Sequence, residues 1–483
     1  MVDPALRQLA LRTLLGAFPG TAPPDWALRL LDDGLAGYVL FGYNITDTAQ
    51  LADLVRQLRE VRPDAIVGID EEGGDVTRLD AARGSSLPGN AALGALDDAT
   101  LTERVAAELG VRLRACGIDL NFAPVADVDT DERNPVIGVR SFGADPELAA
   151  RHVAAWVLGQ QGQCVAAAAK HFPGHGGTDE DSHLTVPVLH ESLEDVQRLA
   201  LPPFRAAIKA DVKIVMTAHI LLPAVDPASP ATLSHPIITG LLRDKLGYDG
   251  VVMTDGLDMY AISRTVGHAE AGVLALLAGV DALCVGGDTV EPGRVELMAD
   301  ALVDAVLSGR LPEQRLVEAA ERVRSLSRWC RDSGAVRDPV TAATLAARQA
   351  VRAHGDVALA SPPLVLELWD GPSVAAGDVP WGVGALLAAR VPGTVVVRLT
   401  DDGTQVAGVL ADHPERRVVV CVRGVRRHAW QARTVQAARG ARPDLIVVDH
   451  DVGSPQDVLG EHHVLAFGAS RITAEAACRL LAD

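Results

Sequence analysis

The sequence predicts an α/β protein: a (β/α)8 TIM-like barrel followed by a smaller α/β three-layer sandwich domain. Eight short, apolar, β-rich runs recur along the first two thirds of the chain, with helical patterns between most of them. These runs are apolar throughout and do not alternate, as expected of strands that are covered on both faces. The same alternation of runs and helical patterns resumes, over a shorter span, after a polar break in the chain.

The eight predicted barrel strands are each four to six residues long. They cover residues 14–18, 38–41, 65–70, 119–124, 166–171, 214–219, 251–255 and 282–285. Helices are predicted between them where apolar residues recur every three or four positions. The clearest helical patterns cover residues 48–59, 100–115, 146–161, 193–209 and 268–277.

A further helix, residues 312–330, ends the predicted barrel domain, and the polar Gly/Pro segment 331–339 follows it. We therefore expect a barrel domain over residues 1–333, a linker helix over 334–352 and a C-terminal sandwich over 353–483. The strands of the sandwich are predicted at 364–368, 394–399, 418–422, 445–448 and 463–467. Its helices are predicted near 405–411, 430–439 and 474–482.

Composition narrows the class of protein and its partners. The chain has 483 residues and a formal net charge of −19, which argues against nucleic acid and anionic membranes as partners. The N-terminal residues lack the basic and apolar regions of a signal peptide, and no apolar run is long enough to span a membrane. The six cysteines are scattered with no Cys-x-x-Cys pair. We expect a cytoplasmic protein with reduced thiols.

The segment from Lys170 to His183 is the richest in chemistry. It reads K-H-F-P-G-H-G-G-T-D-E-D-S-H and holds three imidazoles, one ammonium and three carboxylates. Its Pro and Gly residues exclude a regular helix or strand, and a run of small apolar residues leads into it. This pattern predicts a buried strand that ends in a polar, Gly-rich loop, where α/β enzymes place their active sites.

Other predicted strands also end on polar residues. Asp70, Lys170 with His171, His219 and Asp255 each follow an apolar run. Because the carboxyl ends of barrel strands meet at one face, these side chains are expected to line one pocket. Carboxylates and cations in such a pocket suit the recognition of a polyol and the stabilisation of an oxocarbenium-like centre.

Metal and phosphate chemistry are less favoured at this pocket. No His-Glu-x-x-His motif is present, and the Gly176-Gly177 pair is not followed by the Lys-Ser/Thr of a P-loop. From the residues alone, His171, His175 and His183 remain possible metal ligands. A metal-dependent hydrolase is nevertheless the weakest of the interpretations, because no metal-binding motif is present. No metal and no cofactor is expected.

At these residues the chain resembles glycoside hydrolase family 3, in particular its β-N-acetylglucosaminidase branch, the enzymes of peptidoglycan recycling. The resemblance extends over about residues 10–330, which is the whole predicted barrel. Besides the Lys170 to His183 loop, the matching segments are G-Y-V-L-F at 37–41, D-E-E-G-G at 70–74, N-F-A-P-V-A-D-V at 121–128, R-S-F-G at 140–143, M-T-A-H at 216–219 and T-D-G-L at 254–257.

The resemblance implies a role for each matching residue. Asp255 corresponds to the nucleophile, His183 to the general acid/base and Asp181 to its dyad partner. The residues that correspond to the sugar-binding side chains are Asp70, Arg78, Arg140, Lys170 and His171. The expected substrate is an N-acetylglucosamine-containing oligosaccharide of the muropeptide or chitin type, and the expected assembly is a monomer or a homodimer.

Two departures from the family leave the aglycone preference open. Asp75 stands where arginine is frequent, and Asp258 stands where serine is frequent after the nucleophile. Other readings also remain open. They are a β-N-acetylglucosaminide phosphorylase, since a histidine acid/base does not repel an anionic acceptor, a broader β-glucosidase/β-N-acetylglucosaminidase, and an inactive sugar-binding protein.

Overall fold

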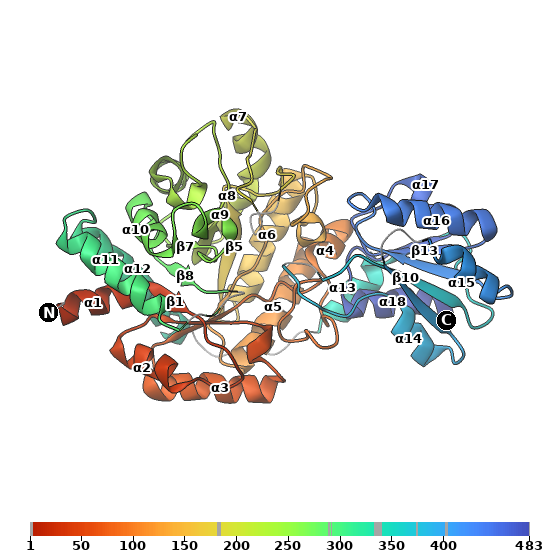
Figure 1. The fold of residues 1–483 in the computed structure, drawn as a ribbon, viewed down its shortest axis with the longest axis horizontal. Coiled ribbons are helices and arrows are strands. Elements are labelled where there is room, and N and C mark those ends of the chain that lie inside the picture. The colour runs from red at the N-terminus through yellow and green to blue at the C-terminus, as the bar shows by residue number, and fades with distance from the viewer. Residues whose placement is uncertain are drawn as a thin grey trace. The chain divides into compact units, whose positions relative to one another are not determined.

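A computed structural model describes residues 3–180, 185–287, 290, 292–332, 341–372, 375–400 and 404–482. The chain forms two compact units (Figure 1). Unit 1 comprises Met1–Glu71, Thr102–Asn134 and Ala144–Val340. Unit 2 comprises Glu72–Leu101, Pro135–Gly143 and Thr341–Asp483. Two segments from the first third of the chain therefore pack with its C-terminal part.

Unit 1 is built on an eight-stranded sheet in the order β7-β6-β5-β4-β3-β2-β1-β8, and every strand pair in it is parallel. An isolated parallel bridge between Met253 and Ala282 joins the two ends of the sheet, so the barrel is nearly closed. The strands are β1 Leu14–Gly16, β2 Gly37–Leu40, β3 Ile66–Ile69, β4 Leu120–Asn121, β5 Ala166–Phe172, β6 Ile214–Thr217, β7 Val251–Thr254 and β8 Leu283–Val285. All eight coincide with predicted runs, and the TIM-like barrel is confirmed.

The barrel strands are buried on both faces, which explains why their sequences do not alternate. Every residue of β2, β3, β5, β6 and β7 is buried. The interior is filled by side chains such as Leu15, Val39 and Ile66. Gly37 is required at its position, because a Cβ there would lie 1.8 Å from the Ile66 carbonyl oxygen on the neighbouring strand.

Helices follow most of the barrel strands, and α6 shows how such a helix begins. The Asp145 side chain accepts from the N–H of Glu147 at the start of α6, and Pro146 occupies its first position. The longer helices of the first two thirds of the chain are α1 Pro4–Leu11, α2 Asp25–Asp33, α3 Thr48–Val61, α5 Ala99–Ala115, α6 Pro146–Gln161, α10 His268–Ala278, α11 Arg294–Leu307 and α12 Glu313–Asp332.

The helix predicted over residues 193–209 is interrupted. It consists of α7 Leu193–Asp195, a π-helical turn η3 Val196–Ala200 and α8 Pro202–Lys209. Pro202 and Pro203 lack the N–H that a continuous helix would use, so the chain starts a new helix there. A second π-helix, η5 Pro236–Lys245, precedes β7.

Unit 2 contains a six-stranded sheet in the order β11-β10-β12-β13-β14-β9. Five strands are parallel: β10 Leu364–Trp369, β11 Val395–Thr400, β12 Val418–Val422, β13 Ile446–Asp449 and β14 His463–Leu465. They confirm the predicted strands of the sandwich. The edge strand β9, Arg352–His354, pairs antiparallel with β14, and its short polar sequence gave no strand signal.

This sheet has a hydrophobic layer on each face, as the three-layer prediction requires. One face of β10, with Val365, packs in a core with α14 Gly384–Arg390 and α18 Arg471–Ala482. The other face, with Leu364 and Leu366, packs in a core with α15 Val406–Asp412, α16 Ala429–Ala441 and α17 Gln456–Leu459. Figure 1 shows these two helix layers on opposite sides of the sheet.

The remaining helices of unit 2 come from its separate segments. They are α4 Asn90–Leu96, η2 Gly138–Arg140 and α13 Ala343–Ala350, the last of which falls within the predicted linker 334–352. The boundaries predicted at residues 333 and 353 remain predictions. Among the described residues, no helix is long and apolar enough to cross a membrane.

Candidate active site

A buried ion pair joins the ends of two barrel strands. Lys170 belongs to β5 and is 2% exposed, and its Nζ lies 2.6 Å from Oδ1 of Asp70, the residue after β3. The carboxylate of Asp70 remains partly exposed. A buried ammonium and a partly exposed carboxylate at one strand edge can donate to and accept from the hydroxyl groups of a ligand.

Asp127 connects the ring of His171, near the end of β5, with the backbone of His175 in the following loop. Its Oδ2 lies 2.7 Å from Nδ1 of His171, and its Oδ1 accepts from the backbone N–H groups of His171, at 3.2 Å, and His175, at 2.7 Å. Burial raises the pKa of Asp127. The interactions with His171, the charge of His175 and the His175 backbone N–H together lower that pKa by more, so the net shift is downward. Because an ionised carboxylate only accepts hydrogen bonds, Nδ1 of His171 carries a proton.

Asp255 follows β7, and its surroundings are set by backbone contacts. Its Oδ1 accepts from the N–H of Gly256 at 2.8 Å. His219 lies 2.9 Å from the Gly256 carbonyl through Nε2 and 2.8 Å from Thr232 Oγ1 through Nδ1. Both nitrogens of the buried His219 ring are thus engaged within the protein. The ring fixes the backbone beside Asp255, and sugar binding by His219 remains a prediction.

Three carboxylates influence one buried thiol at the end of the barrel. Burial raises the pKa of Cys284 in β8, and the charges of Asp255, Asp258 and Asp70 raise it further. The carboxylates that follow β3 and β7 therefore interact electrostatically with a common neighbour, the thiol in β8.

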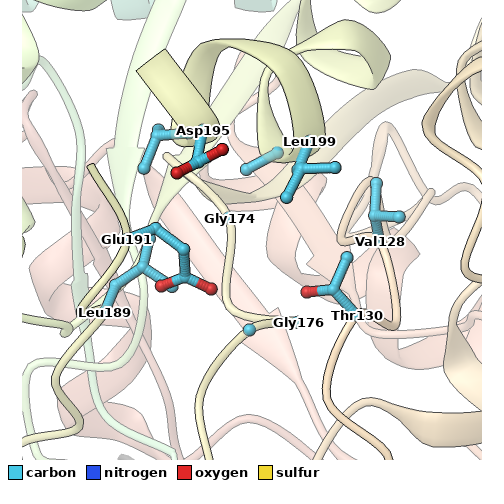
Figure 2. Close-up of a pocket in the computed structure, with 11 residues that line it drawn as sticks. Val128, Thr130, Gly174, Gly176, Leu189, Glu191, Asp195 and Leu199 are labelled. Atoms are coloured by element: carbon cyan, nitrogen blue, oxygen red, sulfur yellow. The ribbon is translucent and has the colours of Figure 1, made fainter. Parts of the chain in front are cut away.

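The loop after β5 runs along a small pocket. Figure 2 shows the backbone of Gly174 and Gly176 between Leu189 and Glu191 on one side and Val128 and Thr130 on the other. Burial raises the pKa of the Glu191 carboxyl. The loop is packed tightly here, because a Cβ on Gly176 would lie 1.8 Å from the Val128 carbonyl oxygen.

The predicted acid/base residues belong to this loop. Asp181 and His183 lie outside the described residues. The part of the loop that is described ends at Glu180 and is held from His175, whose Nδ1 lies 2.8 Å from Thr178 Oγ1 and whose carbonyl accepts from Asn134 at 2.8 Å.

Unit 2 holds the two predicted sugar-binding arginines, each on a defined partner. Arg140 makes a bidentate pair with Glu72, at 2.7 and 3.0 Å, and both side chains are almost fully buried. Arg78 donates through Nη2 to the Ala375 carbonyl at 2.9 Å. The planar guanidinium and its five donors explain why arginine suits these positions.

The structure thus places five of the predicted residues at the carboxyl ends of strands in unit 1 and two in unit 2. The former are Asp70, Lys170, His171, His219 and Asp255. The residue that sequence reasoning missed is Asp127, which was part of a matching segment but received no role. A carboxylate shortly after an apolar run was the signal that could have identified it.

Comparison with known families identifies the family of the chain. Residues 13–326 match the family described as glycosyl hydrolase family 3 N terminal domain. The chain belongs to glycoside hydrolase family 3. The match covers all eight barrel strands and every described residue predicted for the site.

Individual relatives are similar over different parts of the chain. A β-N-acetylglucosaminidase of this family from Paenibacillus sp. is 34% identical, with a TM-score of 0.87, and the alignment covers 99% of this chain and 96% of that one. "Beta-hexosaminidase" from Pseudomonas aeruginosa is 38% identical over 51% of this chain and 74% of its own length. "Beta-hexosaminidase A" from Pseudoalteromonas piscicida is 33% identical over 63% of this chain, which spans only 55% of that relative.

These similarities confirm the family expected from the sequence. As a member of the family the chain is a glycoside hydrolase, and these relatives are of the hexosaminidase type. Among the described residues, no group of three or more His, Cys, Asp or Glu side chains is arranged to hold a metal ion.

Proposed function

We propose that the chain is a retaining exo-β-N-acetylglucosaminidase that removes terminal β-linked N-acetylglucosamine from muropeptide or chitin-type fragments. The observation that carries the proposal is the Lys170–Asp70 pair in the same barrel as Asp255, within the span that matches the family. A buried cation–carboxylate pair gives charge-assisted hydrogen bonds to sugar hydroxyls, each worth about 1.5–3 kcal/mol. His171, Arg78 and Arg140 complete the proposed set of sugar ligands, and His219 lines the subsite.

The reaction proceeds in two displacements. A carboxylate oxygen of Asp255 attacks the anomeric carbon, the bond to the leaving oxygen breaks, and His183 gives that oxygen a proton. Water then attacks the anomeric carbon, His183 takes a proton from it, and the bond to Asp255 breaks. Asp181 orients His183 and stabilises its charged form. An imidazole suits this role because its ordinary pKa, about 6.5, is close to neutral pH.

The proposal is tested with p-nitrophenyl N-acetylglucosaminide and Asp255→Ala. We expect release of p-nitrophenol by the wild-type chain and at least about a thousandfold loss in the variant, because the nucleophile is removed. An unchanged unfolding temperature would show that the fold is intact. A fluorinated N-acetylglucosaminyl inactivator should label Asp255, and labelling elsewhere together with an active Asp255→Ala variant would refute the assignment.

Two finer points belong to the same proposal. Release of free N-acetylglucosamine with and without phosphate distinguishes hydrolysis from phosphorolysis, since a phosphorylase would form the sugar 1-phosphate. The proposed place of action is the cytoplasm, in peptidoglycan recycling, and fractionation of cells that produce the chain checks the location.

A further inference from the structure

We infer that unit 1 carries an accessory sugar site on the face of the barrel opposite the active site, and that it takes one N-acetylated pyranose unit. The site is a pocket of about 220 Å³ between the amino ends of β6 and β7 and the helix α12. The choice of an N-acetylated sugar rests on the proposed function. The pocket and its preference for a neutral polyol rest on the residues that line it.

The first argument is the place of the pocket in the barrel. Lys213 lies directly before β6, and Asp249 lies two residues before β7. The carboxyl ends of the same two strands lead to His219 and Asp255. Because a strand rises about 3.3 Å per residue, Val251 and Asp255 are about 13 Å apart along β7. A sugar unit in this pocket is therefore held away from the bond that the proposed reaction breaks.

The second argument is that the barrel holds the polar walls of the pocket in place. The Lys213 N–H donates to the Gln161 side chain at 2.9 Å, and the Lys213 carbonyl accepts from the Val251 N–H at 3.1 Å. On α12, the Arg322 side chain donates to the buried carboxylate of Asp281 at 3.3 Å. Both walls thus stand on strands and a helix of the barrel, as expected of a site that is formed before its ligand arrives.

The third argument is the apolar floor. Val251 and Leu326 are buried and line the pocket, and the half-buried Trp329 packs against the barrel core from the same helix as Leu326. The Lys213 Nζ lies 5.3 Å from the centroid of the Trp329 ring, so a cation and an aromatic surface meet at one wall. A pyranose ring has a face of CH groups and, when N-acetylated, a methyl group, and both suit such a surface.

The fourth argument is the balance of charge around the pocket. Lys213 and Arg322 can donate hydrogen bonds, Asp249 can accept them, and the Ser325 hydroxyl can do both. Each of the two cations already pairs with a carboxylate that does not line the pocket. An anion therefore gains little here and is repelled by Asp249, whereas a cation is repelled by Lys213 and Arg322. Neutral sugar hydroxyls, which both donate and accept, match all of these groups.

The size of the pocket sets the length of the ligand. A volume of about 220 Å³ equals that of roughly seven water molecules, at about 30 Å³ each. This is room for one monosaccharide unit and not for an oligosaccharide. Asp249 and Ser325 are exposed, so further units of a longer fragment would extend into solvent from this edge.

Lys213 provides a direct readout, because the chain has only four lysines: Lys170, Lys209, Lys213 and Lys245. The full chain is treated briefly with N-hydroxysuccinimidyl acetate at increasing concentrations of N-acetylglucosamine, and peptide mass spectrometry follows the acetylation of each lysine. Once the sugar fills the pocket, acetylation of Lys213 should fall by about three- to tenfold. Lys209 and Lys245 are exposed and do not line the pocket, so their acetylation should stay unchanged.

Variants test whether the pocket carries this protection of Lys213. Ser325→Tyr fills the pocket from the exposed side of α12 and should abolish the effect of the sugar on Lys213. Asp249→Asn weakens an acceptor and should raise the sugar concentration for half protection by about threefold or more. Asp244→Asn, an exposed site on η5 outside the pocket, removes the same charge and should behave as the wild type. Asp255→Ala should keep the protection, because Asp255 follows the opposite end of β7.

The outcomes separate this inference from the proposed function. If p-nitrophenyl N-acetylglucosaminide is cleaved but N-acetylglucosamine leaves the acetylation of Lys213 unchanged, the inference is wrong and the function stands. If Lys213 is protected but no glycoside is cleaved, the site stands and the function is wrong. Equal protection by inorganic phosphate would indicate an anion site, and equal protection by glycerol would indicate an unspecific polyol effect. Either result contradicts the inference, and equal protection by glucose contradicts the choice of an N-acetylated sugar.

Discussion

At the scale of single residues, Asp127 shows how a buried carboxylate organises two parts of the site. It accepts from the ring of His171 and from the backbone that leads into the loop of the predicted acid/base. Because the carboxylate can only accept, it fixes the proton of His171 on Nδ1. When the ring is neutral, Nε2 is then left with its lone pair and can accept from a sugar hydroxyl.

We predict that Asp127→Asn lowers kcat/KM for N-acetylglucosaminides by about ten- to hundredfold, the value of one charge-assisted hydrogen bond. An amide nitrogen facing His171 must donate, so the ring has to move its proton to Nε2 or turn away. The pH profile of kcat/KM should shift as well, because the ionised carboxylate beside the His171 ring becomes a neutral amide. Steady-state kinetics between pH 5 and 8 measure both effects.

Asp119→Asn is the matched control. Asp119 is also a buried carboxylate beside β4, but it precedes the strand and bonds Arg59 at 2.7 Å and the N–H of Val67 at 3.1 Å. Its loss should lower the unfolding temperature and leave the pH profile unchanged. If both variants lose only stability, Asp127 has a structural role and does not position His171.

A site residue could be predicted from the sequence when its position followed from a local pattern. It could not be predicted when its role depended on partners far away in the chain. Asp70, Lys170 and Asp255 were identified because each ends an apolar run, and the barrel face then follows from topology alone. Asp127 was not, because its role depends on the approach of two neighbouring segments, β4 and β5, in space. The engagement of both ring nitrogens of His219 was likewise invisible, since Thr232 gives no local signal.

At the scale of elements, the described part of the loop after β5 is closely packed against neighbouring segments. Gly176 and Gly177 face different neighbours. A Cβ on Gly176 would meet the Val128 carbonyl at 1.8 Å, whereas a Cβ on Gly177 would meet the far end of Glu191 at 2.4 Å. Backbone cannot move aside cheaply, but a flexible carboxylate end can.

Gly176→Ala should therefore reduce kcat on a disaccharide by about tenfold or more, because it displaces the loop that carries the proposed acid. The loss on a dinitrophenyl glycoside should be small, since a good leaving group needs little protonation. Gly177→Ala is the comparison and should lose far less on either substrate. Equal losses of the two variants on both substrates would show that the loop does not position the acid.

Element boundaries were predictable where burial alone decides them. The barrel strands and α6 were predicted to within a few residues because their apolar pattern is continuous or helical throughout. The break in 193–209 was missed because the apolar spacing continues through Pro202, while the missing N–H ends the helix. The edge strand β9 has three exposed residues, so no burial pattern marks it.

At the scale of the whole molecule, unit 2 shows which contacts Asp75 makes at a position where arginine is frequent in the family. Its Oδ1 accepts from the Ala469 N–H at 2.6 Å, and Arg423 lies 3.9 Å from its Oδ2. Arg423 also bonds Asp370 at 3.2 Å and stacks on Trp381 at 4.9 Å. The segment Glu72–Leu101 is thereby fastened to residues of the C-terminal sheet, within the same unit.

The strands beneath these contacts form a switch point. The chain runs from β10 to β11 on one side and then returns to β12 on the other side of β10. Open α/β sheets usually bind ligands in the crevice at this position. Here the residues that follow β10 and β12, Asp370 and Arg423, engage each other, and Arg423 pairs with Asp75 of the chain itself. Residues that follow the strands of the C-terminal sheet thus bind the segment Glu72–Leu101 of the same chain.

We predict that Arg423→Ala lowers the unfolding temperature by about 5–10 °C at pH 7 and by clearly less at pH 4. Burial raises the pKa of Asp75, and Arg423 and the Ala469 N–H partly lower it. A carboxyl with a raised pKa favours the folded state at low pH and opposes it as pH rises from its unfolded value, about 3.9, through its folded value. Removing Arg423 raises that pKa further, so the added cost appears at neutral pH and fades where Asp75 is protonated. Calorimetry at the two pH values measures the difference. Asp75→Asn in the Arg423→Ala background should recover much of the loss at pH 7. An equal loss at both pH values would mean that Arg423 does not stabilise the unit through Asp75.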